Sequence, residues 1–261
     1  MLSHSQVKYI NSLKIKKYRQ QHKAFIIEGE KGVSELLISS LQTQRLYAVS
    51  EWINKNASVV KRRNIDLQEI TADDLKKVSD LVTPNQVLAI AVIPELKEPD
   101  PSQYKGMALA LDGIRDPGNM GTIIRTADWF GIHQIICSTD SVDIYNPKVV
   151  QATMGSFSRV AVSYCNLPDF FKSLPPGTPV FGALLEGPDI TMKTFTHEGI
   201  ILIGSESHGI SASLIPFINE PLHIPLFSKN NIENNIESLN ASVANGIICY
   251  EICKQLSKNN F

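Results

Sequence analysis

The sequence lacks the features of a membrane-embedded or exported protein. None of its 261 residues lies in an apolar run long enough to cross a bilayer. The N-terminal segment is polar and basic, whereas a signal peptide needs an apolar centre. Hydrophobic residues make up 43% and charged residues 20% of the chain, as in ordinary globular proteins. We therefore expect a cytoplasmic protein with no membrane partner.

Cysteine is scarce and does not form a metal-binding pattern. The chain has four cysteines, at positions 137, 165, 249 and 253, and all lie in apolar runs. Cys249 and Cys253 are four residues apart on a predicted helix, which is a spacing that a metal site can use. No second pair and no nearby histidine completes such a site. We expect these thiols to pack in the core and the protein to need no metal.

The sequence also lacks a dinucleotide-binding fingerprint. The glycines of residues 118–121 do not have the G-x-G-x-x-G spacing, and no acidic residue clearly ends the next predicted strand to hold a ribose. A nicotinamide-dependent oxidoreductase is therefore an alternative that titration with NAD would test. There is no internal repeat or low-complexity block, although residues 230–236 are rich in asparagine.

Positive charge is concentrated near the N-terminus. Residues 1–105 carry 16 Lys and Arg against 12 Asp and Glu, whereas residues 106–261 carry 9 against 14. This asymmetry favours a contact between the N-terminal part and a polyanion, and a solvated helix face is the alternative. The first 23 residues contain no acidic side chain and six basic ones: Lys8, Lys14, Lys16, Lys17, Arg19 and Lys23.

The pattern of apolar residues predicts two α/β domains joined by a linker. Residues 94–104 hold three prolines, several charges and almost no apolar side chains, which is typical of a linker. We place a small basic domain at 1–94, the linker at 95–105 and a larger domain at 106–261. In the small domain the spacing predicts helices at 7–18, 32–41 and 73–81 and strands at 25–27, 46–49 and 87–93.

The larger domain alternates strands and helices, which predicts a mostly parallel sheet covered by helices. Its first strand, at 107–111, is followed by a turn at 116–119 and then by a helix at 122–129. A strand, a glycine-containing turn and a helix N-terminus in series are the usual place for a ligand in such a sheet. The pattern continues with a helix at 212–217 and ends with a long helix at 239–256.

Three polar turns follow predicted strands of this domain. The first contains Asn119 and leads to Arg125, the second contains Gly204 and Glu206, and the third runs through 238–240 at the start of the last helix. Each turn has a structural alternative: a simple turn, an N-cap at Ser238, or a surface ion pair for Arg125.

Together the three turns resemble the SpoU (TrmH-like) branch of the SPOUT RNA methyltransferases. The matching segments are N-M-G-T-I-I-R at 119–125, I-L-I-G-S-E-S-H-G at 201–209, and I-P-L followed by S-L-N-A-S-V-A at 238–244. The resemblance covers residues 106–258. More weakly, I-N-S-L-K-I-K-K-Y-R at 10–19 and F-I-I-E-G at 25–29 resemble the small RNA-binding domain that precedes the catalytic domain in many members.

The resemblance implies a SPOUT-type α/β fold with a trefoil knot, a homodimer, S-adenosyl-L-methionine as methyl donor and a ribose 2′-hydroxyl of RNA as acceptor. It makes Arg125 the activator of that hydroxyl. Because a guanidinium stays protonated at neutral pH, we favour a cationic clamp on the ribose and phosphate over a base. The other implied catalytic residues are Asn119, Glu206, Ser238 and Asn240. Backbone groups around Gly204, Ile224 and Leu239 are expected to hold the cofactor.

One segment departs from the family pattern. Residues 227–237 are several residues longer than the corresponding family loop and lack its glycine, so the shape of the cofactor pocket there stays open. We expect an enzyme that methylates a ribose 2′-oxygen in structured RNA, with ribosomal RNA as the substrate and transfer RNA as the alternative. A non-catalytic RNA-binding relative of the same fold is the second alternative, and failure to bind the cofactor would support it.

Overall fold

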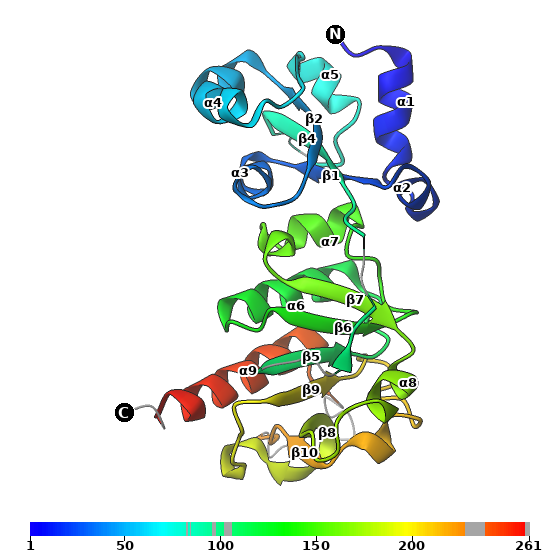
Figure 1. Ribbon diagram of the computed structural model, residues 1–261, viewed down its shortest axis with the longest axis vertical. Coiled ribbons are helices and arrows are strands. Elements are labelled where there is room, and N and C mark those ends of the chain that lie inside the picture. The colour runs from blue at the N-terminus through cyan, green and yellow to red at the C-terminus, as the bar shows by residue number, and fades with distance from the viewer. Residues whose placement is uncertain (82, 84, 96–97, 102–105, 228–237, 259–261) are drawn as a thin grey trace. The chain divides into compact units, whose positions relative to one another are not determined.

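The computed structural model describes residues 1–81, 83, 85–95, 98–101, 106–227 and 238–258, which form two compact units (Figure 1). Unit 1 contains Met1–Glu95 together with Asp143–Arg159. Unit 2 contains Leu96–Val142 and Val160–Phe261. Unit 1 therefore includes a segment from inside the region predicted as the larger domain. Residues 96–97 and 102–105 of the predicted linker lie outside the described residues.

Unit 1 has a mixed four-stranded sheet in the order β1-β4-β2-β3. The pairs β1–β4 and β2–β4 are antiparallel, and β2–β3 is parallel. The strands are β1 (Ala24–Glu28), β2 (Thr43–Ala48), β3 (Leu67–Glu69) and β4 (Val87–Val92). The helices are α1 (His4–Ser12), α2 (Lys16–His22), α3 (Glu30–Ile38), α4 (Ser50–Arg63), α5 (Ala72–Lys76) and α7 (Pro147–Ala152), with η2 at Ser156–Ser158.

The single helix predicted at 7–18 is wrong, because the chain breaks between α1 and α2. A capping box between Ser3 and Gln6 starts α1 earlier than predicted. Leu13 is fully buried at the break, so packing favours the turn. The carbonyl groups of Leu13 and Lys14 accept hydrogen bonds of 3.0 and 2.8 Å from the guanidinium of Arg19. The break therefore leaves these carbonyl groups satisfied.

Sequence patterning also missed α4 and β3. Trp52 and Val60 are the only buried residues of α4, so its apolar stripe is too thin to be recognised from periodicity. Polar residues on its exposed faces hide the helix further. Strand β3 has only three residues, and none of them is buried. Short, half-exposed elements of this kind carry little hydrophobic pattern.

Unit 2 has a six-stranded sheet in the order β10-β8-β9-β5-β6-β7, and every strand pair is parallel. The predicted parallel α/β sheet is therefore confirmed. The strands are β5 (Met107–Leu111), β6 (Gln134–Ser138), β7 (Ala161–Cys165), β8 (Val180–Asp189), β9 (Gly199–Ile203) and β10 (Glu220–His223). The helices are α6 (Pro117–Trp129), α8 (Leu167–Lys172) and α9 (Ala241–Lys258), with short η3 (Ile190–Met192) and η4 (Ile215–Phe217).

Both faces of this sheet are covered, which explains why its strands are apolar throughout (Figure 1). Ala108 and Ala110 pack in a cluster with Phe170 and Phe171 around α8. The intervening Leu109 and Leu111 are also buried and point to the opposite face, since side chains alternate along a strand. Helices α6 and α9 pack against each other. No helix among the described residues combines the length and apolarity that crossing a bilayer requires.

Two helix predictions in unit 2 need correction. Helix α6 begins at Pro117, so the predicted turn at 116–119 is its N-cap and first turn. Asp116 caps it by accepting a hydrogen bond of 2.8 Å from the backbone N–H of Asn119, and Pro117 suits the first helical position. The helix predicted at 212–217 is only the 3₁₀ turn η4, because Pro216 removes a backbone donor.

Candidate active site

The carboxyl ends of the parallel strands meet at one edge of the unit 2 sheet. Helix α6 follows β5, a tight loop follows β9, and α9 begins close to that loop. These three segments carry Asn119, Glu206 and Asn240, which are far apart in sequence. The structure therefore brings three of the five predicted catalytic residues together at the place where ligands bind in open α/β sheets.

Glu206 is the centre of this group. Its Oε1 atom accepts a short hydrogen bond from Nδ2 of Asn119 and longer ones from Nδ2 of Asn240 (3.4 Å) and the backbone N–H of Ala241 (3.3 Å). Asn240 also donates from Nδ2 to Oδ1 of Asn119 at 2.9 Å. The Oε2 atom of Glu206 accepts no hydrogen bond from a described residue, so one carboxylate oxygen is left available. Glu206 thus orients the Asn119 side chain, and it forms no ion pair or hydrogen bond with Arg125.

Asn240, and not Ser238, caps α9. Its Oδ1 atom accepts hydrogen bonds from the backbone N–H groups of Ser242 (3.0 Å) and Val243 (3.4 Å) and from the Ser242 hydroxyl (2.7 Å). The N-cap alternative for Ser238 is therefore wrong. The Ser238 side chain is exposed and makes no hydrogen bond to any residue that the structure describes. The first donors of α9 are already satisfied, so this helix end offers no free anion site.

The loop after β9 is held in a narrow hairpin-like form. Ser205 and Gly209 exchange two backbone hydrogen bonds, of 3.1 and 2.8 Å. A Cβ atom on Gly204 would lie 2.1 Å from the carbonyl carbon of Gly209, so only glycine fits there. This close approach fixes where Glu206 emerges from the loop, and Gly204 acts at least in part as a structural residue.

Arg125 lies on the exposed side of α6, separate from the Asn119 group. It follows Asn119 by six residues, about 9 Å along the helix axis. Its guanidinium makes no ion pair or hydrogen bond with a described residue, which leaves its charge available. The Cα–Cβ bonds of a helix tilt toward its N-terminus, which in α6 is the end that carries Asn119.

The residues predicted to hold a cofactor lie at the same sheet edge. Ile224 directly follows β10, and Leu239 directly precedes Asn240 with 44% of its surface exposed. The neighbouring His223 has a buried Nδ1 atom without a hydrogen-bond partner in the described structure. Apolar side chains, strand-end backbone groups and an unpaired ring nitrogen suit an adenine and its ribose. Residues 228–237 of the predicted longer loop lie outside the described residues.

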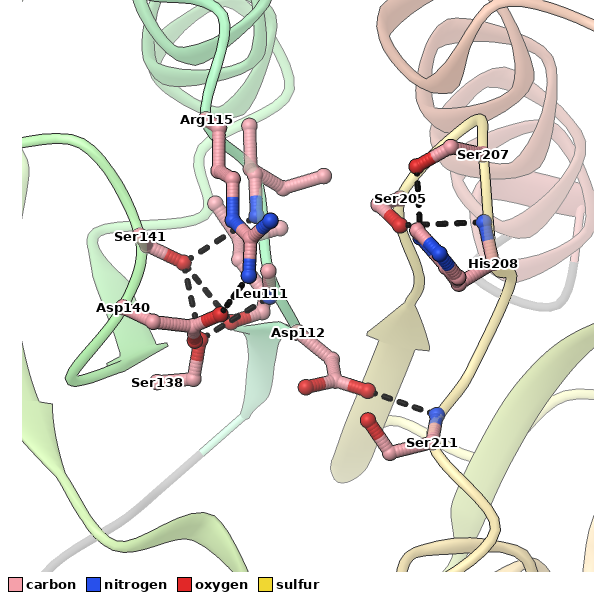
Figure 2. A network of polar contacts seen from close by, with 12 residues as sticks. Leu111, Asp112, Arg115, Ser138, Asp140, Ser141, Ser205, Ser207, His208 and Ser211 are labelled. Carbon is pink, nitrogen blue, oxygen red and sulfur yellow. Dashed lines mark hydrogen bonds and ion pairs between the residues drawn. The ribbon is translucent and has the colours of Figure 1, made fainter.

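Sequence analysis missed a polar cavity of about 300 Å³ beside Glu206. Asp112, Arg115 and Asp140 line it, and they come from the segments that follow β5 and β6 (Figure 2). Arg115 donates to Asp140 at 2.8 Å, and Ser138 donates to the other oxygen of Asp140 at 2.7 Å. The hydrogen bond from Arg115, and to a lesser degree the one from Ser138, hold the pKa of Asp140 below its usual range. A sequence signal for this cavity did exist, because Asp112 and Asp140 come one and two residues after the apolar strands β5 and β6.

The cysteines were predicted to pack in the core, and two of the four are buried while the other two are partly exposed. Cys137 and Cys249 are fully buried, as expected for core residues, and burial raises the pKa of the Cys249 thiol to about 12. Cys253 is half-buried, and its thiol lies 3.7 Å from the carbonyl oxygen of Phe130. Among the described residues there is no group of three or more His, Cys, Asp or Glu side chains arranged to hold a metal ion.

Comparison with known proteins identifies the family. Residues 106–250 match the SpoU rRNA Methylase family, and residues 4–89 match the MRM3-like substrate binding domain. The chain therefore belongs to the SpoU rRNA methylase family. It is 30% identical to the 23S rRNA (guanosine(2553)-2′-O)-methyltransferase RlmP of Bacillus subtilis, over 94% of this chain and 95% of that protein.

Solved structures agree with this assignment. A TrmH-family structure from Porphyromonas gingivalis is 34% identical, covers 97% of this chain and 98% of its own, and superposes with a TM-score of 0.83. The AdoMet-bound rRNA methyltransferase from Sinorhizobium meliloti is 27% identical with a TM-score of 0.84, and the match covers 98% of this chain and 97% of that one. Both likenesses extend over the two units.

Proposed function

We propose that this protein is an S-adenosylmethionine-dependent methyltransferase that modifies a ribose 2′-hydroxyl in ribosomal RNA. The observation that carries the proposal is the Asn119–Glu206–Asn240 group, which is built from three distant segments at the ligand-binding edge of the sheet. Membership of the SpoU rRNA methylase family and the names of the relatives support the reaction type. Transfer RNA is the alternative substrate.

S-adenosylmethionine, when bound, supplies a methyl group already activated on a sulfonium, so the protein must position the acceptor and manage its proton. Arg125 is a charged group with no competing partner among the described residues. It is suited to clamp the ribose and its phosphate and to stabilise negative charge on the 2′-oxygen. Asn119 and Asn240 hold the Glu206 carboxylate in place. The free Oε2 atom of Glu206 is suited to receive the hydroxyl proton as the new oxygen–methyl bond forms.

Unit 1 is proposed to bind the RNA through phosphate contacts. The match to a substrate-binding domain supports this role. The structure refines the set of cations, because Arg19 is only 2% exposed and pairs with Asp143, and Lys14 pairs with Asp80. The N-terminal cations left for phosphates are Lys8, Lys16, Lys17 and Lys23, which are exposed and form no ion pair with described residues.

A homodimer is also part of the proposal. Helix α9 exposes an apolar stripe whose members recur at helical spacing, with Val243 49%, Ile247 37% and Tyr250 58% exposed. A contiguous apolar face of this kind is typical of an association surface. A second copy of the chain is the expected occupant, since the family resemblance implies a dimer and would let the RNA-binding unit of one subunit serve the site of the other. The trefoil knot and the cytoplasmic location also remain predictions.

The test is transfer of tritium from labelled S-adenosylmethionine to total RNA. We expect the wild type to label one ribosomal RNA fraction and Arg125→Ala to lose the transfer while still binding the cofactor in calorimetry. Arg125→Lys keeps the charge and loses the planar fork, so we expect it to stay well below the wild type. Lys172→Ala, which removes an exposed cation from α8 in unit 2, is the control. Absence of both transfer and cofactor binding in the wild type would support the non-catalytic alternative.

A further inference from the structure

The cavity beside Glu206 lies at the ends of β5, β6 and β9, so it borders one of the expected cofactor-binding residues, Gly204, and is separated from another, Ile224. In the strand order β10-β8-β9-β5-β6-β7, the cavity is lined by segments that follow β5, β6 and β9. The cofactor candidates Ile224 and His223 lie at the end of β10, on the far side of β8 and β9. Glu206, in the loop after β9, stands between the two places. An acceptor ribose at Glu206 would therefore have the methyl donor on one side and this cavity on the other.

The walls of the cavity are rich in hydrogen-bond acceptors. Asp112 is only 7% exposed, yet it is charged and lines the cavity. Its Oδ2 atom accepts a 2.7 Å hydrogen bond from the backbone N–H of Ser211, and its Oδ1 atom has no partner among the described residues. Figure 2 shows Asp112 between the Arg115–Asp140 group on one side and the loop with Ser205 and His208 on the other. An acceptor oxygen without a protein partner on the cavity wall can accept a hydrogen bond from a ligand.

The cavity is unsuitable for a phosphate. Its carboxylates are those of Asp112, Asp116, Asp140 and Glu206. The guanidinium of Arg115, the one Arg or Lys group of the lining, is already paired with Asp140 at 2.8 Å. A neutral, flat group with several N–H donors is a better match. Gly113 favours such a shape, because it presents no side chain between Asp140 and Ser205.

We propose that this cavity receives the base of the nucleotide to be methylated and that the base is guanine. The proposal rests on the function proposed above. On its Watson–Crick edge guanine presents two adjacent donors, N1–H and N2–H. The free Oδ1 of Asp112 can accept one of them, and Oδ2 can accept the other through the lone pair that Ser211 does not use. Adenine and cytosine place an acceptor nitrogen beside their single amino group, and it would face the carboxylate unfavourably. Asp112 is thus the specificity-determining residue, and the target base is unstacked from its neighbours to enter the cavity.

Two relatives are named for a guanosine target, whereas a structure that matches 58% of this chain is named for C/U34 of tRNA. The Bacillus subtilis relative is named for a guanosine target. A relative from Blochmanniella floridana, 32% identical over 77% of this chain and 81% of that protein, is named for guanosine as well.

The first experiment needs no RNA and tests the cavity alone. GMP, IMP and AMP are titrated into the full-length protein, and binding is followed by saturation-transfer NMR. We expect GMP to bind, IMP to bind about tenfold more weakly because it lacks the N2 amino group, and AMP not to bind. Asp112→Asn keeps an oxygen for Ser211 and replaces the free acceptor by a donor, so it should lose GMP binding. Asp169→Asn, at an exposed position of α8, is the control. Equal binding of GMP and AMP, or an unchanged affinity in Asp112→Asn, would overturn the proposal.

The second experiment separates this proposal from the proposed function. RNA labelled by the wild-type protein is digested to nucleosides and analysed by mass spectrometry, and the product should be 2′-O-methylguanosine. Asp112→Asn should lower kcat/KM at least tenfold while the Kd for S-adenosylmethionine and the thermal unfolding temperature stay unchanged. A 2′-O-methylated product on another base would overturn the guanine cavity and leave the proposed function standing. No transfer to any RNA, with selective GMP binding retained, would remove the proposed function instead and leave the cavity as a guanine-binding site.

Discussion

Polar groups serve different ends in the interior of unit 1 and at the carboxyl edge of the unit 2 sheet. In unit 1, the buried Arg19 donates four hydrogen bonds, to Asp143 and to two backbone carbonyl groups. At the edge of unit 2, Arg125 is exposed and unpaired among the described residues, and Glu206 and Asp112 each keep one free carboxylate oxygen. A charged group whose hydrogen bonds are satisfied within the protein stabilises the fold, whereas a charged group with a free donor or acceptor at the carboxyl edge of the sheet is available for a ligand.

The largest effect is expected at the edge of the sheet. Glu206→Gln should lower the rate of methyl transfer by about 10²- to 10⁴-fold, which is the range for loss of a positioned proton acceptor. The glutamine keeps an oxygen for the donors from Asn119 and Ala241, so folding should be preserved. Single-turnover transfer and thermal unfolding measure the two quantities. Glu198→Gln, an exposed carboxylate next to β9, serves as control, and near-wild-type transfer by Glu206→Gln would limit Glu206 to orienting its neighbours.

Breaking the buried pair in unit 1 should act on stability instead. Arg19→Met leaves the half-buried Asp143 carboxylate without its cation, and we expect a loss of about 3–5 kcal/mol in the free energy of unfolding. Denaturant titration of the full chain measures it. Combining Arg19→Met with Asp143→Asn should restore part of the stability, since no unpaired charge then remains. A stability loss equal to the sum of the two single changes would contradict the pairing.

The apolar stripe of α9 tests the proposed dimer. Ile247→Glu places a charge in the centre of the stripe and should weaken self-association about thirtyfold or more, the effect of an interface residue worth about 2 kcal/mol. Sedimentation equilibrium of the wild type and variant gives both constants. The exposed isoleucine of another helix, Ile38 in α3, provides the control Ile38→Glu. If the two variants associate equally well, α9 is not the dimer surface.

The smallest effect concerns acid stability in unit 1. Asp74 accepts hydrogen bonds from Lys77 (2.8 Å) and the backbone N–H of Leu2 (3.0 Å), and these contacts, with Lys77 first, lower its pKa to about 2. A depressed pKa contributes stability above the unfolded value near 4 that is lost as the pH falls toward 2. Asp74→Asn should therefore flatten the pH dependence of unfolding in that window. Asp73→Asn, one residue away and exposed, should leave the dependence unchanged.

Elements with a clear apolar period were predictable, and those whose limits depend on single polar contacts were not. The parallel strands of unit 2 are buried on both faces and stand out as apolar runs, so the sheet and its polar edge followed from the sequence. The start of α6 at Pro117 depends on the Asp116 cap, and the break after α1 depends on the guanidinium of Arg19, which lies six residues beyond Leu13. Neither contact has a periodic signal.

The catalytic group was predictable through the three motifs, but its inner arrangement was not. Sequence spacing placed Asn119, Glu206 and Asn240 in separate turns, and only folding of the sheet brings their side chains within hydrogen-bond distance. Asn240 caps α9 and Ser238 does not, because the helix begins at Ala241. The residue at which the helix begins could not be read from the spacing of the motif. The cavity around Asp112 was missed because its walls come from three different strand ends.

The chemical position of the transferred methyl group tests the central claim most directly. Ribosomal RNA labelled by the wild-type protein is hydrolysed in alkali, and the label is separated into mononucleotides and alkali-resistant dinucleotides. A 2′-O-methyl group blocks cleavage of the adjacent phosphodiester bond, so we predict that the label is recovered in a dinucleotide. Label in an ordinary mononucleotide would place the methyl group on a base and would contradict an active site built to activate a ribose hydroxyl.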